Sequence, residues 1–181
     1  MSIFALYASS RPNGNSEQLT DMLLEGTVCT KIILREKNIR PITDQRHTPE
    51  GFRPVDDDYD AIVEEMMRHD VLIFSTPLYW YGMSGPMKDF VDRWSQSLRD
   101  KRYHFKEEMS KKQVYVVITG GDHPRVTGLP LVQQFQHIFR FMGMNFAGYI
   151  IGEGNQPGDV LQDERAVSEA KWLNHRLRGS L

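Results

Sequence analysis

Five short apolar segments alternate with five helical patterns along this chain, and that alternation constrains its fold more than any other feature. The apolar segments show no polar alternation, which is typical of strands that are buried on both faces of a sheet. The predicted strands are residues 2–8, 30–34, 71–76, 114–119 and 146–151. The segment at 2–8 has no basic leader, so we interpret it as a first strand rather than a signal peptide.

The segments between these strands place apolar residues at three- and four-residue spacing, as amphipathic helices do. The predicted helices are one that begins at Asn15 or Ser16, and residues 59–68, 87–98, 131–142 and 164–177. Strands separated by helices form parallel sheets, and right-handed crossovers place helices on both faces. The sequence therefore predicts an α/β three-layer sandwich with a five-stranded parallel sheet in the order 2-1-3-4-5.

Length and composition predict a single domain over residues 1–181 and exclude several classes of protein. The 22 Lys and Arg against 24 Asp and Glu give a net charge of -2, which provides no cationic field for non-specific nucleic-acid binding. Cys29 is the only cysteine, so we expect no intrachain disulfide and a reducing, cytoplasmic environment. Pro77 and Gly82 interrupt the longest uncharged stretch, so no membrane span is expected. The six histidines show no metal-ligand spacing, and no metal site is predicted.

The predicted strand order fixes where a ligand should bind. In open α/β sheets, ligands lie beyond the carboxyl ends of the strands where the winding direction reverses, here between the first and third strands. Three loops meet at that edge, namely residues 9–16, 77–85 and 120–127.

The first of these loops is suited to a phosphate. Ser9, Ser10 and Ser16 provide hydroxyl donors, Arg11 provides a guanidinium, and the loop leads into a helix N-terminus, which favours anions. The glycine patterns of nucleoside-triphosphate and dinucleotide sites are absent, so a monophosphate fits better. The alternative is an ordinary polar turn with Asn15 or Ser16 as the helix cap.

The other two loops favour a flat ligand. Tyr79, Trp80 and Tyr81 follow a buried strand, and exposing so much aromatic surface is unfavourable unless a planar group or another subunit covers it. A dimer contact is the alternative for these aromatic residues, and the two interpretations are compatible. In the third loop, Gly120 and Gly121 allow a close approach of the backbone.

Together these motifs resemble the NAD(P)H-dependent FMN reductases among the flavodoxin-like flavoproteins, a group related to quinone and azo reductases and iron-sulfur flavoproteins. The resemblance implies that FMN is the cofactor, with its phosphate, ring and ribityl chain held by the three loops. The implied cofactor-binding residues are Ser9, Arg11, Asn15, Ser16, Pro77, Leu78, Tyr79, Trp80, Gly120, Gly121 and Asp122.

The resemblance also implies the reaction. FMN would carry a hydride from NADPH or NADH to a quinone, free flavin, azo compound or similar small acceptor, and no catalytic side chain is required. Backbone N–H groups around 79–81 or 120–121 would stabilise the charge that develops on the ring. A homodimer or higher homo-oligomer is expected. The alternative is a flavodoxin-type electron carrier or FMN-binding module without its own turnover.

Three further segments carry expectations. Residues 40–54 contain no cysteine, which excludes the cluster of the iron-sulfur relatives, and we expect this long connection to reach a partner subunit or the flavin edge. The acidic run 56–58 is interpreted as a helix cap. The apolar stripe at 135–144 indicates core or subunit interface, and with Phe90 and Trp94 it is our candidate dimer surface.

Overall fold

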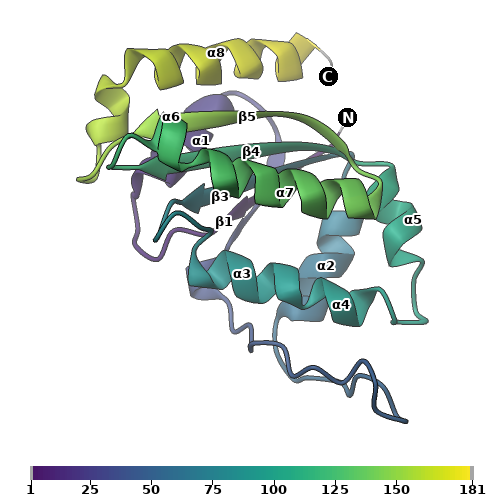
Figure 1. Ribbon diagram of the computed structural model, residues 1–181. Helices are drawn as coiled ribbons and strands as arrows, with labels where there is room; N and C mark the ends of the chain where they lie inside the picture. Colours follow the sequence, from purple (N-terminus) through teal and green to yellow (C-terminus); the bar gives the residue numbers. More distant parts are fainter. Residues whose placement is uncertain (1, 180–181) are drawn as a thin grey trace.

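The computed structural model describes residues 2–179 and contains a five-stranded sheet in the order β2-β1-β3-β4-β5 (Figure 1). All neighbouring strands are parallel, so the predicted topology is confirmed. Every predicted strand is present, and the ends differ from the prediction by two residues at most. The strands are β1 (Ile3–Tyr7), β2 (Cys29–Ile33), β3 (Val71–Pro77), β4 (Gln113–Gly120) and β5 (Asn145–Glu153).

The helices include the five predicted segments, one of them divided. The predicted helix 87–98 forms two helices that meet at Arg93, whose carbonyl accepts a tight i+3 bond from the Gln96 N–H at 2.8 Å. The short helices α5 and α6 were not predicted, because each is too short to show a helical period. The helices are α1 (Asn15–Leu23), α2 (Tyr59–Met67), α3 (Gly85–Asp92), α4 (Trp94–Ser97), α5 (Phe105–Ser110), α6 (Pro124–Thr127), α7 (Leu129–Met142) and α8 (Glu164–Gly179), with 3-10 turns η1 (Leu34–Glu36) and η2 (Asp159–Gln162).

The sheet separates two apolar cores. Successive strand residues point to opposite faces, so Phe4 and Leu6 of β1 join one core while Ile3 and Ala5 join the other. Helices α2, α3 and α7 cover the first face, and α1 and α8 cover the second (Figure 1). None of the helices within residues 2–179 is long and apolar enough to cross a bilayer.

Most of the candidate dimer surface is buried inside the chain, so its core members cannot form an interface, although Phe141 of the stripe is 61% exposed. Phe90, Trp94, Phe135 and Phe139 are at most 4% exposed. The Phe74 ring of β3 packs against Trp94 and Phe139, with centroids 6.0 and 5.5 Å apart. The helical spacing of these residues therefore reflects their packing in the core, which was one of the two interpretations given for the stripe at 135–144.

The connection before α2 is anchored by a buried ion pair. Asp57 and Arg93 are each 1% exposed at the side chain and lie 2.8 Å apart. Asp57 also accepts the backbone N–H of Arg40 at 2.9 Å and that of Tyr59 at 3.1 Å. The N-cap residue of α2 is Asp58, which makes no side-chain cap hydrogen bond, so of the predicted acidic cap only the bond from the Tyr59 N–H to Asp57 is present. The larger role of Asp57 is to anchor the connection, which extends beneath α3 and α4 (Figure 1).

Candidate functional site

A pocket of about 230 Å³ opens at the carboxyl edge of the sheet, between the loops that follow β1, β3, β4 and β5. All the predicted site residues except Trp80 and Asp122 line it. These two line an adjoining hollow of about 170 Å³, which shares Leu78, Gly120 and Gly121 with the pocket. The fold therefore brings the predicted residues to one edge. The pocket residues are Ser9, Arg11, Gly14, Asn15, Ser16, Pro77, Leu78, Tyr79, Thr119, Gly120, Gly121, Gly154 and Asn155.

The N-terminus of α1 faces this pocket without a side-chain cap. Its N-cap residue is Gly14, so the interpretation of Asn15 or Ser16 as the cap is wrong. The first N–H groups of a helix lack intrahelical partners and carry the positive end of its dipole. Ser16 adds a hydroxyl that is 1% exposed and has no hydrogen-bond partner within residues 2–179. A buried donor without an acceptor is costly, so this corner is built for an anion.

Ser9 and Asn15 hold the loops together instead of offering free donors. The Ser9 hydroxyl donates to the Arg11 carbonyl at 2.8 Å and accepts the Arg11 N–H at 3.3 Å. The Asn15 amide donates to the Gln156 carbonyl at 2.9 Å, and its oxygen accepts the Gly158 N–H at 3.0 Å. Their side chains thus shape the pocket walls in this structure.

Glycine is required where the first loop enters the helix. A Cβ on Gly14 would lie 2.5 Å from the Ser9 hydroxyl oxygen, which is closer than real contacts allow. The Ser9 oxygen cannot rotate away without losing its bonds to Arg11. The close approach of these two residues therefore fixes the curvature of the loop.

Sequence reasoning missed the loop after β5. Gly154 and Asn155 line the pocket, and the Arg11 guanidinium donates to the Asn155 carbonyl at 3.0 Å. The available signal was the cluster of turn residues Gly154 to Gly158 directly after a predicted strand, at the same sheet edge as the other loops. Arg11 consequently bridges the first and last loops of the site.

The aromatic loop is a strained two-residue turn. The backbones of Tyr79 and Gly82 exchange two hydrogen bonds of 3.0 Å, and the residues between them, Trp80 and Tyr81, have φ values of 48° and 63°. Left-handed backbone costs about 1–2 kcal/mol for each residue that is not glycine. Trp80 is 97% exposed, so no packing within the chain compensates for this strain.

Hydroxyl groups tie this turn to its neighbours. The Tyr79 hydroxyl lies 2.9 Å from the Ser10 hydroxyl, and the Tyr81 hydroxyl donates to Asp122 at 3.1 Å. This hydrogen bond raises the pKa of Tyr81, so its hydroxyl stays protonated near neutral pH. The Tyr79 N–H is used within the turn, which removes it from the N–H groups predicted to face a flavin.

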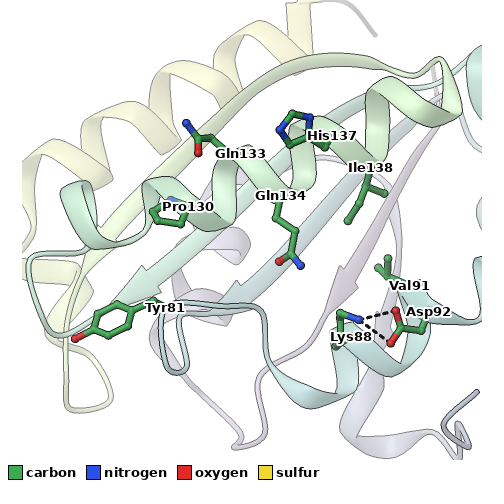
Figure 2. Close-up of a pocket in the computed structure, with 9 residues that line it drawn as sticks. All are labelled: Tyr81, Lys88, Val91, Asp92, Pro130, Gln133, Gln134, His137 and Ile138. Atoms are coloured by element: carbon green, nitrogen blue, oxygen red, sulfur yellow. Dashed lines mark hydrogen bonds and ion pairs between the residues drawn. The ribbon is translucent and has the colours of Figure 1, made fainter.

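A second, larger hollow of about 690 Å³ continues from Tyr81 along the groove between α3 and α7 (Figure 2). Figure 2 shows Gln134 and Ile138 pointing from α7 towards α3. There the Lys88 ammonium pairs with both Asp92 oxygens, at 2.6 and 2.7 Å. Because this ion pair is internal to α3, the groove presents amide and apolar groups more than net charge.

Comparison with known proteins agrees with this geometry. A family model described as NADPH-dependent FMN reductase matches residues 1–156. A putative NAD(P)H-dependent FMN-containing oxidoreductase of Bacillus subtilis is 51% identical over 177 residues, which cover 97% of this chain and 98% of that protein.

Solved structures show the same architecture. One described as a Trp repressor binding protein from Bacillus subtilis has a TM-score of 0.81 and 44% identity, and the match covers 95% of this chain and 97% of that one. An FMN-dependent NADH-azoreductase from Bacillus anthracis, solved with FMN, has a TM-score of 0.69 at 12% identity, covering 97% and 98% of the two chains. At that identity, the second similarity supports the fold alone.

Proposed function

The chain belongs to the family of NADPH-dependent FMN reductases, and from that membership we propose that it passes reducing equivalents from NAD(P)H, through FMN, to a small acceptor such as a quinone, a free flavin or an azo compound. Membership confirms the predicted enzyme class, an NAD(P)H-dependent oxidoreductase, and the predicted cofactor, FMN. The acceptor and the residues that hold the cofactor are our proposal.

The observation that carries the proposed site is the unpartnered Ser16 hydroxyl, buried at the uncapped N-terminus of α1. A phosphate there would receive the Ser16 O–H and the first N–H groups of the helix, while Arg11, whose guanidinium donates to the Asn155 carbonyl, would add a cation at the rim. The donor set therefore fits the FMN phosphate. The remaining predicted residues form the walls that a flat ring system requires.

The bound FMN would supply the redox chemistry, by accepting a hydride from NAD(P)H and delivering two electrons to the acceptor. The chain's own residues bind and orient it. Pro77 and Leu78 provide an apolar wall, and the backbone at Gly120 and Gly121 lines the pocket next to Leu78. A Cβ at Gly121 would lie 3.1 Å from the Asn155 side chain, so glycine lets the loops that follow β4 and β5 approach each other closely.

A titration and a turnover assay test this function. We expect the apoprotein to bind FMN with the absorbance change of a protein-bound flavin, and the loaded protein to oxidise NADH or NADPH when a quinone or free flavin is supplied. Flavin binding without turnover would instead support the electron carrier. A failure to bind FMN in excess would contradict both.

We also propose a cytoplasmic homodimer. The exposed aromatic turn and the α3–α7 groove are adjacent, and Tyr81 lines both the groove and the hollow next to the pocket. A second copy that covers this surface would shield Trp80 and narrow access to the ring. The connection at 40–54 does not line the pocket in the described part of the chain, so its contact with a partner subunit stays a prediction.

A further inference from the structure

A partly buried ion pair adjoins the proposed phosphate site, because one of its members follows Ser16 in α1. Glu17, in the first turn of α1, is 7% exposed and forms a short ion pair with Arg35 of η1. The Arg35 side chain is 20% exposed, and it also lies 3.5 Å from the carboxylate of Glu36. Neither Glu17 nor Arg35 lines the pocket. A carboxylate one residue after Ser16 is unexpected beside an anion site, because like charges repel.

Glu17 has a second contact that explains its position. Its other carboxylate oxygen accepts the backbone N–H of Asn13 at 3.0 Å. Asn13 has a φ of 55°, and the Gln18 side chain holds its carbonyl at 2.7 Å. Gly14 has no side chain with which to cap the helix, and Glu17 reaches back from the third helical position to the N–H of Asn13, one residue before the N–H that a capping box uses. It thereby fixes the strained residue that turns the loop into α1.

Arg35 then has two functions in the same place. Its guanidinium neutralises Glu17, and it also donates to the Arg11 carbonyl at 3.5 Å, on the outer side of the loop. Without Arg35, the buried carboxylate would stand uncompensated behind a group that carries up to two negative charges. When one member of a buried ion pair is removed, the other stays buried as a charge, and its desolvation cost is no longer offset.

We propose that Glu17 and Arg35 are positioning residues for the cofactor phosphate. Glu17 holds the turn at Asn13 through its carboxylate, and Arg35 neutralises the negative charge of that carboxylate. The inference rests on the proposed function, since it concerns the same phosphate. It predicts that the pair acts on flavins through the phosphate and leaves recognition of the ring unchanged. Riboflavin, which has the ring without the phosphate, separates the two contributions.

The test compares dissociation constants for FMN and riboflavin, measured by flavin fluorescence on apoprotein whose folding is checked by circular dichroism. Arg35→Met is expected to weaken FMN binding at least about tenfold, because the unmasked carboxylate repels the phosphate, and to leave riboflavin binding unchanged. Glu17→Ala is expected to weaken FMN binding similarly by releasing Asn13. Glu17→Gln keeps an acceptor for the Asn13 N–H and is expected to retain the wild-type affinity.

The double variant Glu17→Gln with Arg35→Met removes both charges and is expected to recover most of the affinity lost in Arg35→Met. The matched control is Lys31→Met, which breaks another ion pair between α1 and β2, Lys31 to Asp21 at 2.6 Å, away from the turn. It should leave the FMN-to-riboflavin ratio unchanged.

Three results would overturn the inference: wild-type FMN affinity in Arg35→Met, equal losses for FMN and riboflavin, or a double variant as weak as Arg35→Met. If the wild-type protein itself bound FMN no better than riboflavin, the phosphate site and with it the proposed function would fail. A normal wild-type preference with unaffected variants would remove only this inference.

Discussion

At the scale of single residues, Ser16 is the side chain whose structure most directly demands a ligand. Its hydroxyl is buried and unpartnered, so the apoprotein bears a cost that an anion relieves. We expect Ser16→Ala to weaken FMN binding about tenfold, the loss typical of a charge-assisted hydrogen bond, while the apoprotein keeps or slightly gains thermal stability. Flavin titration and thermal unfolding of the same preparations measure both effects.

The control for Ser16→Ala is Ser10→Ala in the same loop. Ser10 is exposed and its hydroxyl is hydrogen-bonded to that of Tyr79 at the rim, so its removal should change FMN affinity much less. Equal losses in the two variants would show that the loop as a whole, and not the buried hydroxyl, determines binding.

The residues of the first loop show where sequence reasoning reaches its limit. The residue types predicted an anion site at this loop, because hydroxyl and guanidinium groups at a helix N-terminus suit one. Which of these side chains would bind other loops, and which would remain free for a ligand, was not predictable. Asn15, for example, binds Gln156, which is 141 positions away in sequence. Such a partner is known only once the chain is folded, and so is the fact that Ser16 is left free.

At the scale of elements, the turn of Tyr79 to Gly82 combines backbone strain with an exposed side chain. Asparagine and glycine are the residues that this type of two-residue turn prefers, since both tolerate positive φ. We expect Trp80→Asn to raise the stability of the apoprotein by roughly 0.5–1 kcal/mol. The same change should lower NAD(P)H turnover, since the proposal places Trp80 beside the ring.

Chemical denaturation of the Trp80→Asn variant measures the gain in stability, and steady-state assays measure the loss of turnover. Trp172→Asn is a control for the loss of an exposed tryptophan, because Trp172 is 61% exposed on α8, outside the strained turn. A Trp80→Asn variant that was both less stable and fully active would contradict the idea that the strained turn is retained because Trp80 is needed for turnover.

The Arg93–Asp57 pair is the element-scale contact that fastens the long connection. Burial pushes the pKa of Asp57 up, but hydrogen bonds from Arg93 and from the Arg40 and Tyr59 N–H groups outweigh this and hold it below its ordinary value of 3.8. A carboxylate whose pKa is lower in the folded state stabilises the fold above its unfolded pKa. That stability is lost as the pH falls through the folded value.

We therefore expect Arg93→Met to lower the free energy of unfolding by about 3–5 kcal/mol at neutral pH, because it strands a buried carboxylate. The deficit should shrink as the pH falls, because burial raises the pKa of the unpaired Asp57 and the variant takes up its proton at a higher pH than the wild-type protein does. The wild-type advantage is then lost as the pH falls below 3.8, through the lowered folded-state pKa of Asp57. Urea denaturation at a series of pH values measures the difference in the free energy of unfolding between the wild-type protein and the variant. Arg165→Met breaks an exposed pair with Glu169 and should cost well under 1 kcal/mol at every pH.

Elements differ in how well the sequence predicts them, and the reason is burial. The central strands β1, β3 and β4 were found almost to the residue because they are mainly apolar and buried, which follows from helices covering both faces of the sheet. The break at Arg93 was not found, because the apolar period continues through it; there Arg93 pairs with Asp57, 36 positions earlier, a contact that helical spacing does not report. The stripe at 135–144 carried a helical period that core and interface share, and only the structure distinguishes them.

At the scale of the whole molecule, the proposed dimer would complete the surroundings of the site, because a second copy would cover the α3–α7 groove and Trp80. Two glutamines of α7, Gln133 and Gln134, line the groove beside Asp92. If a second copy covers this groove, replacing both with glutamate would bury added negative charges at the interface, which is costly. We expect the double variant to sediment at the mass of one 21.0 kDa chain and the wild-type protein at twice that mass.

The same variant separates assembly from cofactor binding. Because the groove lies outside the flavin pocket, we expect it to keep FMN affinity within about threefold while losing most of its NAD(P)H turnover, since the partner no longer covers Trp80. Trp172→Ala on α8 is a matched surface change on the other face of the sheet and should leave both mass and turnover unaltered. A wild-type protein that sediments as a fully active monomer would refute the dimer, and a glutamate variant that stays dimeric would place the interface elsewhere.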